Sequence, residues 1–256
     1  MAVVVPPLLL LAGAAGGAAL ARRSLKAGAA GGIAGLLMVL GKLAIARVPA
    51  AEARLFPFDA YPFIEPLWYL VPLGYTMGAG VWAARNSLWK RDLLLVLGGL
   101  FLVRLGLLAW ESRGGHAPLR GVLDGEGICR QTTSWSCAPA AAVMFLDRHA
   151  IGATEREMAE LCASRPGLGG TSECGIVRGL RRKMPGRRIE ATAPRLDDLR
   201  VPSLVSVRLN WLVNHCVLVE AVGPDDVRVA DPIDGRRAIP RDVFLRDWTG
   251  SAIHAR

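Results

Sequence analysis

The sequence lacks three patterns that would each assign it to a class of proteins. Its five cysteines form no C-x-x-C pair, so no structural zinc site is expected, and nothing else in the chain indicates a cofactor. No G-x-x-x-x-G-K-[ST] motif occurs, which excludes a nucleotide-driven motor within the chain. Basic residues are not interleaved with aromatic residues, so nucleic acid is not an expected partner.

Apolar residues are abundant and unevenly distributed. They make up 52% of the 256 residues and concentrate in four stretches, at residues 3–21, 28–45, 63–84 and 93–110. Each stretch is close to the ~20 residues that a membrane-spanning helix needs. We therefore predict about four transmembrane helices in residues 1–110, a linker at 111–123 and a separate domain at 124–256.

The basic residues predict how these helices are oriented. Two basic loops follow the first and third apolar stretches, and they contain Arg22, Arg23 and Lys26, and Arg85, Lys90 and Arg91. By the positive-inside rule both loops face the cytoplasm, which puts the C-terminal domain on the other side. We expect an integral protein of the bacterial inner membrane, in contact with the lipid bilayer, with an extracytoplasmic domain.

Three charged residues fall within or beside the apolar stretches: Lys42, Glu65 and Arg104. Ionisable groups inside a membrane span can mark a transport pathway. Snorkelling, or a partner inside the helical bundle, is the simpler interpretation because no proton-relay pattern accompanies them.

The second half of the chain changes from helical to strand patterns. Helices are predicted from about residue 138 to 149, from 155 to 163 behind a Thr154–Glu157 capping box, and from Thr171 or Ser172 to Lys183. Short Val-rich runs follow at residues 201–209, 215–222 and 226–231, with another candidate at 236–240. Helices first and strands second predict an α+β domain with an antiparallel sheet.

Cys137 is the first candidate for chemistry in this domain. It lies where a loop rich in Ser and Thr becomes an Ala-rich helical pattern. At a helix start, free backbone N–H groups and the helix dipole favour the thiolate over the thiol. Gln131, six residues upstream, supplies an amide able to hold an oxyanion.

A nucleophilic cysteine needs a base and a residue that orients the base. Of the four histidines, only His215 begins a predicted strand, and Asp231 ends the next one. If residues 223–226 close a hairpin, Asp231 lies opposite about Leu218. His215 is then about three residues, roughly 10 Å, further along. A bend at Asp231-Pro232 would have to close that gap.

Together these residues resemble a known family, the papain-like, bacteriocin-processing cysteine peptidase domain, also called the double-glycine leader peptidase domain. The matching pieces cover residues 124–250, and they are Gln131, the Cys137-Ala138-Pro139-Ala140 helix start, Gly170-Thr171-Ser172, His215 before Val217-Leu218-Val219, Asp231-Pro232 with Gly235, and Trp248-Thr249-Gly250.

The resemblance implies roles for four residues and a class of substrate. Cys137 would be the nucleophile, and His215 the base. Asp231 would orient that base, and Gln131 would donate to the oxyanion. Family substrates are peptides cut after Gly-Gly, usually during export. The chain departs from the family in having Ser136 and Ala138 beside the cysteine, where an acidic residue and Gly are usual. It also lacks the exporter's ATP-binding domain.

We therefore predict a membrane-anchored cysteine peptidase that cleaves peptides or leader sequences through an acyl-enzyme. A separate export system is a candidate partner. The alternative is a non-catalytic peptide-binding module on a membrane scaffold associated with an exporter, and a transporter subunit is a third option. Two further questions stay open: whether Cys162 and Cys174 form a disulfide, with Cys129 pairing elsewhere, and whether the Arg-rich segment 178–188 contacts lipid or only solvent.

Overall fold

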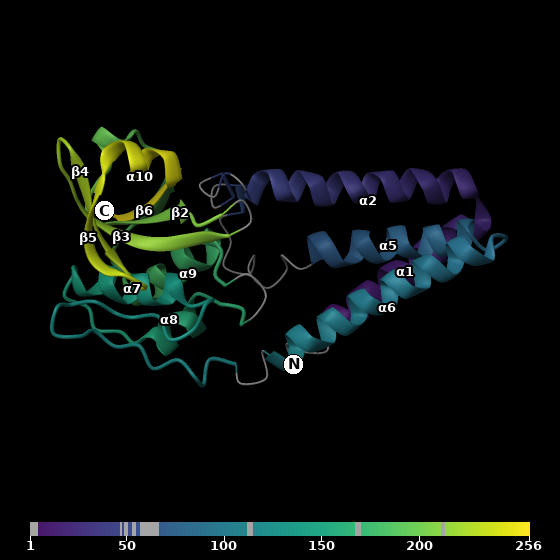
Figure 1. The fold of residues 1–256 in the computed structure, drawn as a ribbon, viewed down its shortest axis with the longest axis horizontal. Helices are drawn as coiled ribbons and strands as arrows, with labels where there is room; N and C mark the ends of the chain where they lie inside the picture. Colours follow the sequence, from purple (N-terminus) through teal and green to yellow (C-terminus); the bar gives the residue numbers. More distant parts are fainter. Residues whose placement is uncertain are drawn as a thin grey trace. The chain divides into compact units, whose positions relative to one another are not determined.

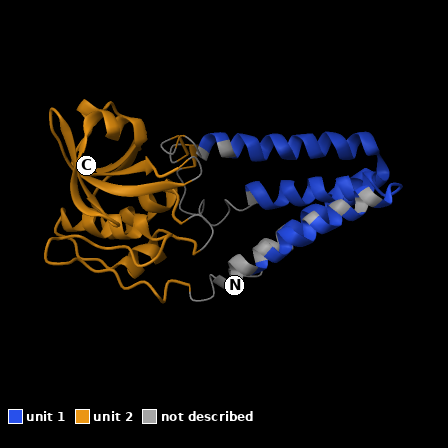
Figure 2. Cartoon of the chain, in the orientation of Figure 1, with its two compact units in different colours: residues 1–45, 63–113 blue, residues 46–62, 114–256 orange. Residues whose placement is uncertain are grey.

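The computed structural model describes residues 5–46, 48, 51–52, 55–56, 67–111, 115–166, 170–210 and 213–256. The chain divides into two compact units, coloured separately in Figure 2. Unit 1 comprises Met1–Ile45 and Phe63–Arg113, and unit 2 comprises Ala46–Pro62 and Gly114–Arg256.

Unit 1 contains the helices α1 (Val5–Arg23), α2 (Leu25–Ala46), α5 (Leu67–Ala83) and α6 (Leu88–Glu111). Glycines let α1 and α5 approach each other closely. A Cβ added at Gly17 would lie 2.1 Å from the Tyr75 carbonyl oxygen, and one at Gly78 would lie 1.9 Å from the Ala14 carbonyl oxygen. Only glycine fits at such backbone contacts. The small residues of these helices therefore serve helix–helix packing.

The prediction of about four transmembrane helices is wrong. Among the described residues, only Leu25–Lys42, within α2, is long and apolar enough to cross a membrane, and this rests on length and composition alone. The first stretch owes its apolar character largely to Ala and Gly, and α5 has 17 residues. In α6 the apolar run Leu94–Val103 is short, with Asp92 and Arg104 close to its ends.

Of the charged residues in the apolar stretches, Lys42 is described by the structure and Glu65 is not. The Lys42 ammonium lies over the Tyr69 ring, 5.9 Å from its centroid, so its partner is inside the helical unit as the simpler interpretation held. Glu65 lies outside the described residues.

Unit 2 is an α+β domain, as predicted. From residue 115 on, the described helices that precede the strands are α7 (Cys137–Asp147), α8 (Glu155–Leu161) and α9 (Glu173–Lys183). The remaining elements are β1 (Ile189–Thr192), the 3-10 helix η1 (Leu196–Asp198), β2 (Ser203–Arg208), β3 (Asn214–Val222), β4 (Asp226–Asp231), β5 (Gly235–Pro240), α10 (Arg241–Asp247) and β6 (Trp248–Ala255). The strands form one antiparallel sheet in the order β1-β6-β2-β3-β4-β5.

The predicted helix starts have their expected caps. The Thr154 side chain accepts a hydrogen bond from the Glu157 backbone N–H, and Ser172 does the same for Gly175 at the start of α9. The reciprocal half of the Thr154 capping box is replaced by an ion pair, because the Glu157 carboxylate binds Lys183 on α9.

Helices cover both faces of the sheet, with α7 and α10 on opposite sides in Figure 1. Residues 138–146 of α7 are all buried. Their alanines let the helix lie close to the sheet residues Leu204, Cys216 and Leu218, which belong to the same core. Val-rich positions on the opposite face pack with Phe244 of α10. The helix that begins at Cys137 thus packs against the sheet face that includes β3.

A β-bulge at Glu220 sets the register between β3 and β4. Val219 pairs with Val229, but Ala221 pairs with Arg228, so Glu220 is the extra residue. Beyond the bulge, Leu218 pairs with Ala230 and not with Asp231 as an uninterrupted hairpin would require. The bulge therefore brings Asp231 one residue nearer to His215.

Candidate active site

Cys137 is the first residue of α7, and the loop before it is closed by its own hydrogen bonds. The buried Ser136 hydroxyl donates to the Thr133 carbonyl at 3.0 Å and accepts from the Thr133 backbone N–H. Ser136 makes no side-chain cap hydrogen bond to α7. The positive end of the helix dipole is thus left to the Cys137 side chain.

His215 and Asp231 form a buried pair. The His215 Nε2 lies 2.8 Å from Asp231 Oδ1, and the two residues are 3% and 1% exposed. Since a carboxylate accepts, Nε2 carries the proton in this bond. The Nδ1 atom is then the nitrogen left for Cys137, which lies near enough to the ring to raise its pKa. The imidazole therefore bridges the sulfur and the carboxylate.

Asp231 is held from three directions. Its Oδ1 also accepts from the Ile233 backbone N–H at 2.7 Å, and its Oδ2 accepts from Arg237 at 3.0 Å. Burial alone would raise the pKa of Asp231. The bonds from His215 and Ile233 and the charge of Arg237 outweigh it and lower that pKa. The carboxylate therefore stays ionised beside the histidine.

The neighbouring Asp231 and Cys137 raise the pKa of His215 to about 9. Burial alone would lower it, but the hydrogen bonds with Asp231 and Cys137 favour the imidazolium more strongly. The site can therefore hold a protonated imidazole next to a sulfur nucleophile over the neutral pH range.

Gln131 lies in the loop that leads to Cys137. Its side-chain amide donates to the Thr133 carbonyl at 2.9 Å, and its backbone N–H donates to the Pro232 carbonyl at 3.1 Å. The second bond ties the residue to the segment just after Asp231. The amide's other N–H is the one that a substrate oxygen could use.

The structure thus pairs His215 directly with Asp231, places Cys137 near enough to interact with His215, and connects Gln131 to them through the neighbouring backbone. Gly170 packs against the same loop and has a φ of +71°. A Cβ added there would lie only 2.9 Å from the Trp135 carbonyl oxygen. A side chain could not be accommodated at that position.

Two positions of this site were missed from the sequence. Arg237 appeared as one of two arginines in a strand, with no signal that it would bind Asp231. Glu155 is fully buried and accepts from the backbone N–H groups of Gly121 and Thr132, both at 2.8 Å. It thereby anchors the chain on both sides of Gln131. A charged residue in the first turn of a helix gave no sign of this role.

The five cysteines are all free, which answers the open question of disulfides for this structure. Cys129, Cys162, Cys174 and Cys216 are buried, and Cys137 is the partly exposed one. Burial raises the pKa of Cys129 and of Cys162 to about 12. Only Cys137 therefore combines access with a base.

Comparison with known proteins places residues 126–256 within the sequence model of the Peptidase C39 family. An uncharacterized protein of Methanothermobacter thermautotrophicus is 31% identical over 131 residues, covering 51% of this chain and 89% of that protein. One of Methanothermobacter marburgensis is 30% identical over 138 residues, covering 53% and 92%.

Solved structures show a similar domain at low identity. The peptidase domain of Streptococcus ComA, described as a bifunctional ABC transporter in quorum sensing, has 20% identity and a TM-score of 0.45, covering 49% of this chain and 94% of that one. A double glycine motif protease from an AMS/PCAT transporter, in complex with its leader peptide, has 19% identity and a TM-score of 0.44, covering 53% and 96%.

Proposed function

Because the chain belongs to the Peptidase C39 family, we propose that it is an active cysteine peptidase with Cys137 as nucleophile. The observation that carries this proposal is the imidazole of His215, which lies 2.8 Å from the Asp231 carboxylate and close enough to Cys137 for the two groups to interact. A nucleophile, a base and an orienting acid in contact are what acyl transfer requires, whereas peptide binding alone requires none of them.

The proposed reaction proceeds in two stages. The Cys137 thiolate attacks the scissile carbonyl carbon, and the free N–H of the Gln131 amide donates to the resulting oxyanion. The His215 imidazolium gives its proton to the departing amine, which leaves an acyl-thioester on Cys137. A water molecule then loses a proton to His215 and attacks the thioester, releasing the acid and regenerating the thiolate and imidazolium pair.

We further propose that the substrates are peptides cut after Gly-Gly, in the manner of leader peptides. Support comes from the family and from the similar protease that was solved with a leader peptide bound. A separate export system remains the candidate partner. Ser136 and Ala138 replace the usual neighbours of the nucleophile, so the residues accepted beside Gly-Gly are expected to differ from those of other members.

The experiment uses the purified full chain, a thiol alkylating probe and a Gly-Gly peptide library. We expect Cys137 to be labelled and the library to be cut after Gly-Gly. Cys137→Ala should abolish both activities, and His215→Ala should remove labelling at pH 7. His149→Ala, which removes a histidine from the other end of α7, should behave as the parent does. Peptide binding without cleavage by the parent would instead support the non-catalytic alternative.

Localisation in a membrane stays a proposal, now based on α2 alone. The predicted outward orientation depended on loops between four spans, and that inference falls with them. We expect the full chain to remain in the membrane fraction after carbonate extraction, because Leu25–Lys42 is long and apolar enough to span. Release into the soluble fraction would contradict this proposal.

A further inference from the structure

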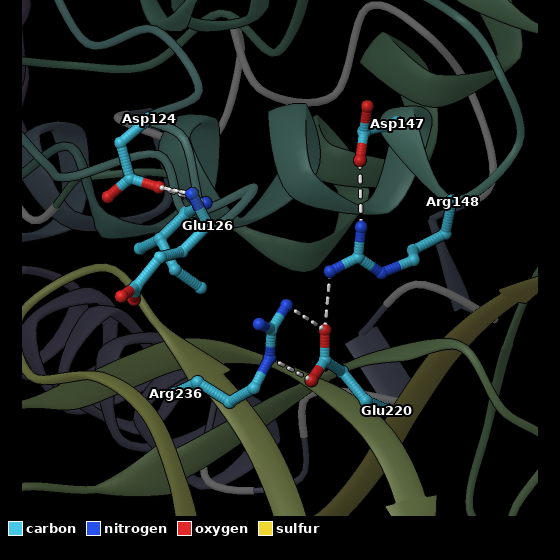
Figure 3. Close-up of polar contacts among 7 residues, drawn as sticks. Asp124, Glu126, Asp147, Arg148, Glu220 and Arg236 are labelled. Atoms are coloured by element: carbon cyan, nitrogen blue, oxygen red, sulfur yellow. Dashed lines mark hydrogen bonds and ion pairs between the residues drawn. The ribbon is translucent and has the colours of Figure 1, made fainter.

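A network of ion pairs connects the far end of α7 to the strand that carries His215. Arg148 directly follows α7, and its Nη2 lies 2.5 Å from Glu220 Oε1. Arg236 of β5 binds the same carboxylate with two bonds, of 2.8 and 3.1 Å. Figure 3 shows the Glu220 carboxylate between the two guanidinium groups, with Asp147 on the far side of Arg148. Three elements therefore meet at one carboxylate.

Two contacts, one at each end, thus join α7 to β3. At one end Cys137 meets His215, and at the other end Arg148 meets Glu220. Cys137 and Arg148 are 11 residues apart, which is about 16 Å along a helix. His215 and Glu220 are five residues apart, which is about 16 Å along a strand. The two elements run in the same direction. The distance between the two contacts is therefore about the same measured along α7 as measured along β3.

The position of Glu220 follows from the bulge. As the extra residue in β3, it is released from the cross-strand pairing with β4. Its side chain is 17% exposed, less than those of Arg148 and Arg236 at 29% and 41%. Burial alone would raise the pKa of Glu220, but the bonds from Arg236 and Arg148 lower it, so the carboxylate is charged at neutral pH.

Near Cys137, the core between α7 and β3 offers little that would fix their register. The first turns of α7 contribute Ala138, Ala140, Ala141 and Ala142 to the core that contains Cys216 and Leu218, and the larger residues 143–146 come only in the second half of the helix. Methyl groups present a smooth surface and few interlocking contacts, and apolar attraction has no direction. A shift by one helical rise would move the sulfur by ~1.5 Å relative to the imidazole.

We propose that Glu220 is a positioning residue that fixes how far α7 is advanced along β3, and thereby the separation between Cys137 and His215. This inference rests on the proposed function, because it concerns the geometry of the same reacting pair. Displacement of reacting groups by about 1 Å can cost about 100-fold in rate, so a distant ion pair acting on register has a measurable effect.

The test is the rate of Cys137 alkylation by iodoacetamide as a function of pH, in the full chain. Glu220→Gln is expected to lower this rate at pH 6.5 by about tenfold or more, since less of the sulfur is paired with imidazolium. Glu157→Gln is the matched control. It removes a comparable ion pair, to Lys183, that joins α8 to α9 and leaves α7 and β3 untouched. The denaturation midpoint is measured for both variants.

A merely structural role would lower the denaturation midpoints of the two variants alike and leave alkylation unchanged. Glu220→Asp, which keeps the charge, should recover part of the rate. If Cys137 in the Glu220→Gln variant is alkylated as fast as Cys137 in the Glu157→Gln variant, the proposal is overturned. Should Glu220→Gln fail to fold, two arginine variants decide. Arg148→Gln cuts the link to α7 and should reproduce the loss, whereas Arg236→Gln spares that link and should lose less. Equal losses would overturn the proposal.

The result for His215→Ala separates this inference from the proposed function. If that variant is alkylated at the parent's rate, the peptidase proposal fails and the positioning role fails with it. If His215→Ala reacts slowly while Glu220→Gln reacts normally, the peptidase stands and only the positioning role of Glu220 is lost.

Discussion

At the scale of single residues, the site depends on one carboxylate. Asp231 accepts from His215, from the Ile233 backbone and from Arg237, and it is 1% exposed. A carboxylate with these partners, and a fourth in the Asp234 backbone N–H at 3.4 Å, cannot rotate away without leaving one of them unsatisfied in a buried place. The histidine is therefore oriented by a group that is itself immobilised.

Replacing Asp231 tests the electrostatic role of that group. The pKa of His215 is raised to about 9, so the imidazolium should persist up to that pH and activity should fall above it. Asp231→Asn removes one of the two contacts that raise this pKa. The alkaline limb of kcat/KM should then move to lower pH, and the rate at pH 7 should fall by about 10²-fold or more.

The control for this prediction is Asp234→Asn, which removes the other carboxylate bound by Arg237, at 2.7 Å, without touching His215. Its alkaline limb should stay near that of the parent. An unchanged limb in Asp231→Asn would contradict the electrostatic role.

Prediction of these residues from the sequence succeeded for their types and for the elements that carry them, but not for their spacing. An uninterrupted hairpin leaves His215 and Asp231 about 10 Å apart. The bulge at Glu220 changes that register, and nothing in the run HCVLVEAV distinguishes a bulged glutamate from an exposed one. Glu155 was missed because its partners Gly121 and Thr132 are distant in sequence. Arg237 was missed because its bond to Asp231 depends on how the turn between β4 and β5 folds back.

At the scale of elements, the positions of α7, α8 and α9 were predictable from caps and apolar spacing, whereas the helix α10 and two strands were not predicted. The strand β1 has only four residues, and β6 contains Gly250 with φ +78°. Such segments carry little strand propensity of their own, and their pairing with each other and with β2 determines them.

The packing of α9 against the end of α8 makes a prediction at this scale. A Cβ at Gly175 would lie 2.4 Å from the Cys162 carbonyl oxygen. Alanine favours helices over glycine by about 1 kcal/mol. Overpacking against backbone costs about 1–3 kcal/mol, so Gly175→Ala should lower the denaturation midpoint.

The comparison variant is Gly186→Ala, at a glycine where an added Cβ meets nothing within 4 Å. It should leave the midpoint unchanged or slightly higher. A Gly175→Ala protein as stable as Gly186→Ala would show that α9 can move away from Cys162.

At the scale of the whole molecule, the sequence predicted the fold class of unit 2 better than it predicted the nature of the helices of unit 1. In unit 2 the order of helical and strand patterns gave the α+β class. In unit 1 the length of the apolar stretches was mistaken for membrane-spanning capacity. Gly and Ala lengthen an apolar run, but they contribute little burial energy and permit the close contact seen between α1 and α5.

Unit 2 also contains a buried acid that couples its layers and makes its stability depend on pH. Glu173 of α9 accepts from Ser206 of β2 and Ser251 of β6. Burial raises the pKa of Glu173 to about 7, in spite of both hydroxyl groups. A raised carboxyl pKa contributes stability that is full below the unfolded value of 4.5 and is lost as pH rises through about 7.

Glu173→Gln should therefore be more stable than the parent at pH 8 and show a smaller difference at pH 5. Denaturation midpoints measured from pH 5 to 8.5 test this, and parallel curves for the two proteins would contradict it. The Gln amide keeps an acceptor for one serine, so the comparison isolates the charge.

The burial of four of the five cysteines gives the chain a simple thiol count. Ellman's reagent added to the folded protein should release colour equivalent to a single sulfhydryl, and the same reagent in denaturant should release five. A reading above one thiol in a sample without denaturant would then indicate unfolded protein, and no attached label is needed to detect it. It also means that a mild oxidant has one target on the folded chain, and that target is the sulfur on which turnover is proposed to depend.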